Sequence, residues 1–211
     1  MEATPVTPRP AATVILIREG GRHNEVGLEL LMLQRGMAAG FMPGVWVFAG
    51  GVVDPEDIAG ASDPPRGLEP DEWAHRIAGA RELGEEGGIE IAPTELRAWS
   101  RWITPEPVPA RFDTRFYVAL APPHSTPEAD GVEMDRARWI GPGAALEAAA
   151  VGEMEISFPT IHHLEELRQI SDAAAVLAAA AARIVEPILP RVVGDRDSFE
   201  VLLPGDSRYP D

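Results

Sequence analysis

Three glutamates lie close together in a segment whose sequence favours a helix. Glu82 and Glu86 are four residues apart and Glu85 is three residues after Glu82, so a helix places their carboxylates on one face. Like charges on one face repel one another unless a cation neutralises them, and oxygen ligands favour a hard ion such as Mg²⁺ or Mn²⁺. Arg81, four residues before Glu85, can offset part of this charge. The cluster predicts a divalent-metal site; the alternative is a solvated acidic helix.

The chain around this cluster resembles the Nudix family of diphosphate-cleaving hydrolases. The sequence box of that family reads Gly, five residues, Glu, seven residues, then Arg-Glu-aliphatic-any-Glu-Glu-any-Gly-aliphatic. Residues 81–89 match the second half at every position. In the first half, Gly51 is followed after five residues by Asp57 instead of Glu, and 23 residues separate Asp57 from Arg81 where the pattern has seven. The box is therefore interrupted by 16 additional residues.

The additional residues precede the expected metal-binding helix. The segment at about 58–70 contains two Gly and three Pro and has no apolar period, so we interpret it as an inserted loop. Loops tolerate insertions when the groups they connect stay in place, which favours a working box over a broken, inactive one. Pro70 and the Gly87-Gly88 pair delimit a helix over 71–86, and the glutamates lie in its last turns.

Motifs outside the box are similar to those of one Nudix branch, the mammalian peroxisomal coenzyme A diphosphatase and its bacterial relatives. They are Gln34-Arg35 and the segments 41–48, 102–105 and 111–116. A coenzyme A diphosphatase signature, aligned without gaps, matches at Leu31, Arg35, Gly44, Phe48, Gly50 and Gly51. It fails at Met32, Leu33, Gln34, Gly36, Gly40 and Ala49. Because the signature has an arginine where this chain has Gly40, the substrate is less well defined than the reaction.

The resemblance implies a set of site residues and a Mg²⁺ or Mn²⁺ cofactor. The expected metal ligands are Glu82, Glu85, Glu86 and the backbone carbonyl of Gly51. Arg81 would orient the carboxylates through charge-assisted hydrogen bonds, and Asp57 would take the outer role of the missing Glu. The general base is either Glu82 or Glu133, because members of the family differ in which Glu they use.

The net charge of −16 must be reversed locally for a diphosphate to bind. We therefore predict three substrate-binding cations, Arg35, Arg111 and Arg115, although each could instead belong to a structural ion pair. His162 and His163 have no Cys or third His nearby and are assigned to structure. The five Trp are expected in the core, although Trp46 or Trp102 could flank a substrate base.

The composition excludes several classes of protein. The strongly acidic charge argues against nucleic acid and anionic membrane surfaces as partners. No apolar run is long enough to span a membrane and residues 1–10 lack the apolar core of a signal peptide, so a cytoplasmic location is expected. The absence of Cys excludes zinc thiolate sites and thiol nucleophiles.

We expect an α/β (α+β) protein with the Nudix fold, a mixed β-sheet sandwiched between helices. Strands are predicted over 13–18, 28–34, 46–48, 97–103, 112–120, 137–140 and 199–203. Helices are predicted over 71–86, 142–149 and 159–183. Residues 1–150 are assigned to the Nudix domain and 151–211 to a helical C-terminal extension, packed on that domain or on a second subunit of a homodimer.

Three functional hypotheses remain open at this point. The first is a metal-dependent diphosphatase that acts on coenzyme A or acyl-coenzyme A and releases 3′,5′-ADP. The second keeps the chemistry but takes another nucleoside diphosphate derivative, such as ADP-ribose, NADH or a sugar nucleotide. The third is a non-catalytic Nudix protein that binds a nucleotide. The complete motif over 81–89 argues against the third, whereas Asp57 and the insertion argue for it.

Overall fold

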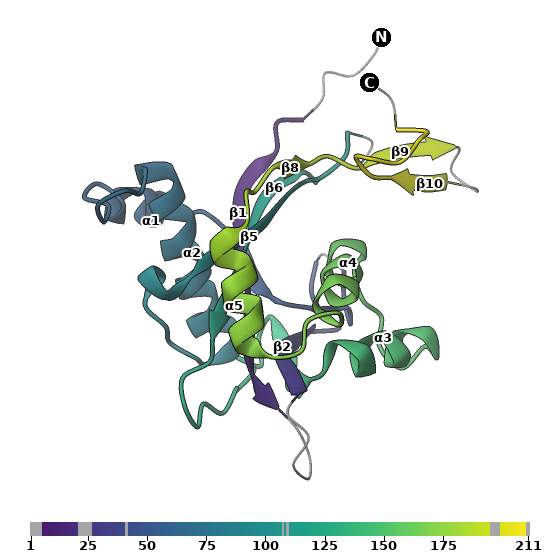
Figure 1. The fold of residues 1–211 in the computed structure, drawn as a ribbon, viewed down its shortest axis with the longest axis horizontal. Coiled ribbons are helices and arrows are strands. Elements are labelled where there is room, and N and C mark those ends of the chain that lie inside the picture. Colours follow the sequence, from purple (N-terminus) through teal and green to yellow (C-terminus); the bar gives the residue numbers. More distant parts are fainter. Residues whose placement is uncertain are drawn as a thin grey trace.

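The computed structural model describes residues 6–20, 27–40, 42–106, 108, 110–194 and 199–209. Its centre is a mixed sheet with the strand order β3-β2-β1-β6-β5-β8, to which β4 and β7 add by pairing with β1 and β2 (Figure 1). The strands are β1 (Arg9–Gly20), β2 (Gly27–Arg35), β3 (Trp46–Val47), β4 (Ala49–Val52), β5 (Arg97–Ile103), β6 (Phe112–Leu120), β7 (Met134–Ile140) and β8 (Pro187–Ile188). The central strand β1 pairs parallel with β6 and antiparallel with β2 and β4.

Helices cover both faces of this sheet (Figure 1). They are α1 (Pro55–Gly60), α2 (Pro70–Gly87), α3 (Pro142–Ala150), α4 (Phe158–Leu167) and α5 (Ala173–Ala182), with a 3₁₀ turn at Pro93–Glu95. Alternate residues of β1 face opposite ways, as strand geometry requires. Val14 and Leu16 join the core under α2, whereas Ile15 and Ile17 join the core under α4 and α5. The expected sandwich of a mixed sheet between helices is confirmed.

The structure confirms most predicted elements and corrects three. The segment expected to be a loop, residues 58–70, begins with the last residues of α1, a helix that Asp54 and Asp57 start with a capping box at its first turn. The single helix expected over 159–183 is two helices, interrupted before Asp172, whose side chain caps α5. The predicted last strand is β10 (Phe199–Leu202), and it pairs with β9 (Arg191–Gly194), which was not predicted. Phe41 of the predicted motif lies outside the described residues.

The C-terminal helices pack on the sheet itself. Ala173, Val176 and Ala180 of α5 are buried in the same core cluster as Ile15 and Ile17 of β1. Among the described residues, no helix combines the length and the apolar character needed to cross a membrane.

His163 is buried in this core and supports it through two hydrogen bonds. Its side chain is 1% exposed, with Nε2 2.6 Å from Ser100 Oγ and Nδ1 2.6 Å from the carbonyl oxygen of Pro159. Burial lowers the pKa of His163 to about 3. This environment suits the structural role expected for this histidine.

Acid should therefore destabilise the protein through His163. In the unfolded chain the histidine has its ordinary pKa of about 6.5, so below that pH it binds a proton that it does not bind in the folded protein. Stability should fall as pH drops from about 6.5 towards 3, by up to about 1.4 kcal/mol per pH unit from this group. Urea unfolding of the wild type and of His163→Gln at several pH values measures this difference. The variant should be less stable at pH 7 and show a shallower pH dependence; equal slopes would contradict the assignment.

Candidate active site

The last two turns of α2 bring two carboxylates against β4. The helix ends at Gly88, whose φ of 66° is left-handed, so Glu82 and Glu86 lie on its final turns. Glu86 is 4% exposed, and its Oε2 accepts a hydrogen bond from the backbone N–H of Gly50 at 2.8 Å. Glu82 lies over Gly51 so closely that a Cβ there would be 2.3 Å from its Oε1.

Burial and like charge make these carboxylates weak acids. Desolvation raises the pKa of Glu86 to about 8, and the negative charges of Glu82 and Glu133 add to this effect. Desolvation likewise raises the pKa of Glu82, against the lowering effect of neighbouring Arg81. The ionised form of each carboxylate is therefore destabilised, and a nearby cation would stabilise it.

Glu133, the residue before β7, lies near the same carboxylates, because β7 begins beside Arg35 at the end of β2. The N–H of Gly36, next to β2, donates to the carbonyl of Glu133 at 2.8 Å. Asp130 Oδ1 accepts from the backbone N–H groups of Glu133 at 3.1 Å and Met134 at 2.8 Å, which fixes the loop before β7. Asp130 was not predicted as a site residue; an Asp followed by Gly131 is the signal for such a turn.

Arg81 joins Asp57, which directly precedes the inserted segment, to the carboxylates. Its guanidinium donates to both oxygens of Asp57, at 3.2 and 2.9 Å, and to Glu82 and Glu85, each at 2.9 Å. It also donates to the carbonyl of Val52 at 3.1 Å. Asp57 is 2% exposed and therefore depends on this partner. The structure thus brings Asp57 to Arg81 despite the insertion. The side chain of Glu85, in contrast to that of Asp57, is 61% exposed.

The donor chemistry of this cluster suits a divalent cation. Glu82, Glu86 and Glu133 are close enough for their charges to act on one another, and all supply the oxygen donors that Mg²⁺ and Mn²⁺ prefer. Within the described ranges, however, no group of three His, Asp or Glu side chains is already arranged to hold a metal. Arg81 holds Glu82 and the neighbouring Glu85 in the arrangement seen here, so metal binding through either of them would require its carboxylate to reorient.

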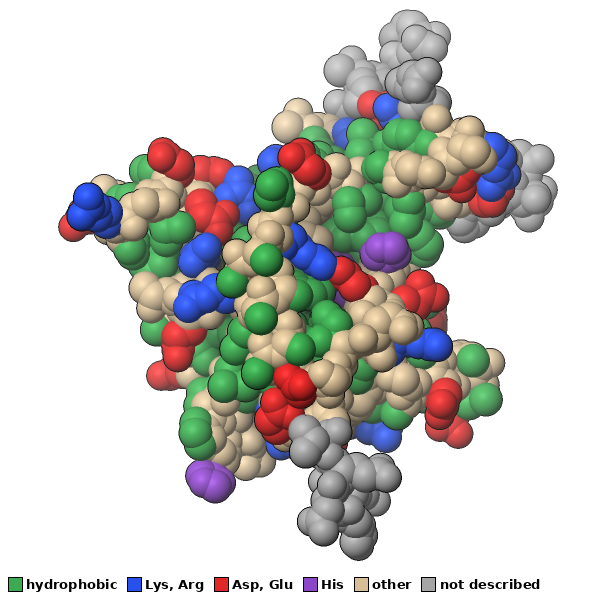
Figure 2. Space-filling view, in the orientation of Figure 1, with side chains coloured by type: hydrophobic (Ala, Val, Ile, Leu, Met, Phe, Trp, Pro, Cys, Tyr) green, Lys and Arg blue, Asp and Glu red, His purple; other side chains and the backbone are tan. Residues whose placement is uncertain are grey.

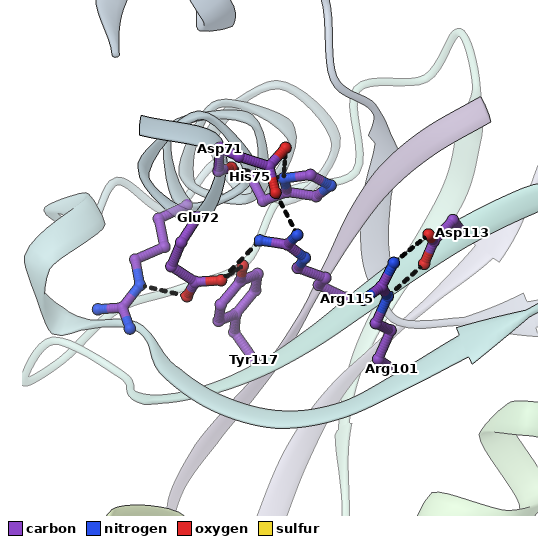
Figure 3. Close-up of polar contacts among 8 residues, drawn as sticks. Asp71, Glu72, His75, Arg101, Asp113, Arg115 and Tyr117 are labelled. Atoms are coloured by element: carbon purple, nitrogen blue, oxygen red, sulfur yellow. Dashed lines mark hydrogen bonds and ion pairs between the residues drawn. The ribbon is translucent and has the colours of Figure 1, made fainter. Parts of the chain in front are cut away.

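Two of the three predicted substrate arginines have structural partners instead. Arg111 is 8% exposed and donates to the carbonyls of Thr104 at 2.9 Å and Val6 at 2.7 Å. Arg115 contacts Asp71 and donates to Glu72 at 2.8 Å, beneath the start of α2 (Figure 3). Neither arrangement favours substrate binding. Of these three arginines, Arg35 is the one near the carboxylates, where its charge lowers the pKa of Glu86.

The network in Figure 3 is balanced in charge. Arg101 forms two hydrogen bonds with Asp113, at 2.8 and 2.6 Å. Glu72 accepts hydrogen bonds from Arg76, Arg115 and Tyr117. This region therefore anchors α2 to β6 and β6 to β5, and it is not an anion site. A groove of about 530 Å³ lies at the opposite end of β2, beside Leu28 and Leu146, and takes no part in the carboxylate cluster.

Two neighbouring glycines should respond differently to the same substitution. In Gly50→Ala the new Cβ would be 2.5 Å from the backbone oxygen of Ala12, so the strand pair must shift, and we expect a loss of about 1–3 kcal/mol in stability. In Gly51→Ala the atoms nearest to the new Cβ would all belong to the side chain of Glu82, which can move. Gly51→Ala should keep most of its stability but lose activity more than about tenfold. Urea unfolding measures the stability of both variants, and a turnover assay measures their activity. Equal losses of stability and of activity in the two variants would contradict this prediction.

Comparison with known proteins identifies the class. The NUDIX domain family model matches residues 7–160. The chain therefore belongs to the Nudix family, and the prediction that it is a Nudix hydrolase is confirmed. Nudix hydrolases generally use divalent metals, in agreement with the donor chemistry of the site.

Particular relatives resemble nearly the whole chain. Putative nudix hydrolase 7 of Caenorhabditis elegans is 29% identical over 241 residues, covering 96% of this chain and 75% of that protein. Acyl-coenzyme A diphosphatase NUDT19 of Gallus gallus is 26% identical, covering 96% of this chain and 80% of its own length. The crystal structure of a NUDIX hydrolase from Alicyclobacillus acidocaldarius superposes with a TM-score of 0.71 at 27% identity, covering 83% of this chain and 96% of that one.

Proposed function

We propose that this Nudix hydrolase uses Mg²⁺ or Mn²⁺ to cleave the diphosphate bond of coenzyme A or acyl-coenzyme A, giving 3′,5′-ADP and (acyl-)phosphopantetheine. The observation that carries the reaction is the placement of buried Glu86 and partly buried Glu82 against Gly50 and Gly51, with the charge of Glu133 acting on both. The similarity to acyl-coenzyme A diphosphatase NUDT19, 26% over almost the entire chain, supports the substrate.

In this proposal the residues of the cluster have distinct roles. The metal ligands are Glu82, Glu85, Glu86 and the carbonyl of Gly51. The chemistry that a divalent ion supplies at such a site is neutralisation of charge on the diphosphate oxygens and a lower pKa for the attacking water. Arg81 orients Glu82 and Glu85, and Asp57 positions Arg81.

Two further groups act on water and substrate. The general base that removes the proton from the attacking water is Glu82 or Glu133, since both lie in the cluster. Arg35 binds the diphosphate, because it is the predicted cation that lies beside Glu86. The positive charge of Arg35 would offset, at this site, the negative potential of a chain whose net charge is −16.

A second substrate class follows from Gly40. The coenzyme A signature has an arginine at this position, and a Cβ placed on Gly40 would meet nothing within 4 Å. Without that cation, another nucleoside diphosphate derivative, such as ADP-ribose, NADH or a sugar nucleotide, is the alternative substrate.

A turnover panel decides between the two. The protein is incubated with Mg²⁺ or Mn²⁺ and coenzyme A, acyl-coenzyme A, ADP-ribose, NADH or a sugar nucleotide, and the products are separated by chromatography. We expect preferred release of 3′,5′-ADP from the coenzyme A compounds. Preference for another compound would reject the coenzyme A substrate, and no turnover on any of them would reject the proposed reaction.

A further inference from the structure

The chain that leads into the two glycines of the site is held by the connection between α3 and α4. β3 pairs with β2 along one edge, and at its other edge the N–H of Trp46 donates to the carbonyl of Glu155 at 2.7 Å. Trp46 also forms a parallel β-bridge with Ile156. These contacts add residues 154–157, which we call the α3–α4 segment, to the sheet beside β3.

The α3–α4 segment is fixed at both of its ends. At its start, the N–H of Met154 donates to the carbonyl of Ala148 in α3 at 3.2 Å. At its end, Ser157 Oγ lies 2.8 Å from Thr160 Oγ1, and the Ser157 carbonyl accepts from the N–H of Ile161 in the first turn of α4. Hydrophobic side chains gather around α4 on the face drawn in Figure 2. The segment is thus tied to two helices that pack on each other and can hold β3 in place.

The strand that carries Gly50 and Gly51 is anchored by side chains on the face away from α2. The two glycines have no side chains of their own, and in the part of the chain that the structure describes β4 pairs with β1 and with no other strand. The nearest large anchors are Trp46 and Phe48, both buried in the core under α4 and α5. The ring of Phe48 also contacts that of His163 in α4, with the centroids 6.3 Å apart.

The position of these glycines affects the candidate metal ligands directly. The N–H of Gly50 donates to Glu86, and Gly51 lies against Glu82 and supplies the carbonyl that we assign as a ligand. Mg²⁺ requires near-octahedral geometry with oxygens at about 2.1 Å. A displacement of the glycines by about half an ångström would therefore weaken metal binding.

We infer that the α3–α4 segment positions the backbone of Gly50 and Gly51 for the divalent metal. Met154, which is buried, and Ile156, which is partly buried, are then positioning residues, although both pack in the core on the other face of the sheet. This inference rests on the proposed function, because it takes the Gly51 carbonyl as a metal ligand. It deepens that function by making metal affinity depend on residues outside the carboxylate cluster.

The test measures Mn²⁺ binding by electron paramagnetic resonance, without substrate. The double variant Met154→Ala, Ile156→Ala removes the apolar side chains of the segment. The matched control, Val176→Ala, Leu177→Ala, removes one buried and one partly buried side chain of the same core from α5, which packs on β1, β5 and β6. We expect about tenfold weaker Mn²⁺ binding in the segment variant, because groups that orient metal ligands contribute 10–100-fold to affinity. The control should keep the wild-type affinity.

A conservative variant and a stability measurement separate positioning from folding. Met154→Leu, Ile156→Val nearly preserves the apolar volume and should bind Mn²⁺ within about twofold of the wild type. Urea unfolding gives the stability of every variant, and circular dichroism verifies that each is folded. If the double alanine variant does not fold, Ile156→Ala alone should show a smaller loss of affinity in the same direction, and wild-type affinity in that variant would overturn the inference.

The outcomes distinguish this inference from the proposed function. If the segment variant binds Mn²⁺ as tightly as the wild type, or if it and the control lose affinity in proportion to their lost stability, the inference is wrong and the proposed reaction stands. Weaker Mn²⁺ binding in the segment variant alone supports the inference even when the turnover panel favours another diphosphate. A wild type that binds no Mn²⁺ would overturn both.

Discussion

Glu86→Gln should reduce turnover by more than about 100-fold while making the metal-free protein more stable at alkaline pH. The loss of turnover follows if Glu86 is a metal ligand, because even residues outside the ligand shell contribute 10–100-fold at metal sites. The gain in stability follows from burial: the folded pKa of about 8 exceeds the ordinary value of 4.5, so the folded wild type holds a proton that the unfolded chain releases. Wild-type stability therefore falls as pH rises from about 4.5 to 8, and the glutamine removes this loss.

The measurement is urea unfolding in EDTA at several pH values, together with turnover in Mg²⁺. Above pH 8 the variant should be more stable than wild type by more than about 1 kcal/mol, since each unit of pKa difference corresponds to about 1.4 kcal/mol. Glu90→Gln, an exposed carboxylate beyond the same helix end, is the matched control and should change neither quantity. Wild-type activity in Glu86→Gln would disprove the assignment of this residue to the metal site.

Arg81→Ala should destabilise the protein by about 3 kcal/mol, because it leaves Asp57 buried and unpaired. It also leaves Glu82 and Glu85 without their shared cation, so turnover should fall more than about tenfold. Asp57→Ala should have a comparable effect on stability, since it removes a buried partner of Arg81 and the hydrogen bond from the backbone N–H of Asp54 that completes the capping box of α1.

A double-mutant cycle tests whether the two residues act as a pair. The double variant Arg81→Ala, Asp57→Ala should lose at least about 1 kcal/mol less than the sum of the single losses, because the second substitution removes a charge that is already unpaired. Strictly additive losses would show that Asp57 and Arg81 contribute independently. In that case Asp57 would not act on the carboxylates through Arg81.

The sequence predicted the parts of the structure that depend on local chemistry. The helix over α2 was predicted to within one residue at each end, because Pro70 and the Gly87-Gly88 pair are strong local signals. The strands over β5 and β6 were predicted at their observed bounds, since both are short apolar runs between polar segments. The hairpin partner β9 was missed because four residues rich in valine carry no period that distinguishes a strand from a loop.

The partners of charged side chains were the less predictable part. Nothing in the sequence near Arg115 indicates that Asp71 and Glu72, more than forty residues earlier, would lie beside it. The buried pairing of Arg111 with two backbone carbonyls depends on how β6 enters the sheet. Asp57 was expected to take the outer role of the missing Glu, but its pairing with Arg81 was not predicted. The assignment of the metal ligands themselves stays a prediction for the experiments above.

The parallel pairing of β1 with β6 has a consequence for how the protein is made. Arg9 of β1 lies opposite Phe112 of β6, so the centre of the sheet joins segments more than one hundred residues apart. Contacts of such long range slow folding, because the intervening chain must lose its freedom before they form. A growing chain on the ribosome therefore carries β1, with its apolar Ile15, Leu16 and Ile17, as an unfinished strand until β6 has emerged. Chaperones that cover exposed strand edges should matter most for this protein during synthesis.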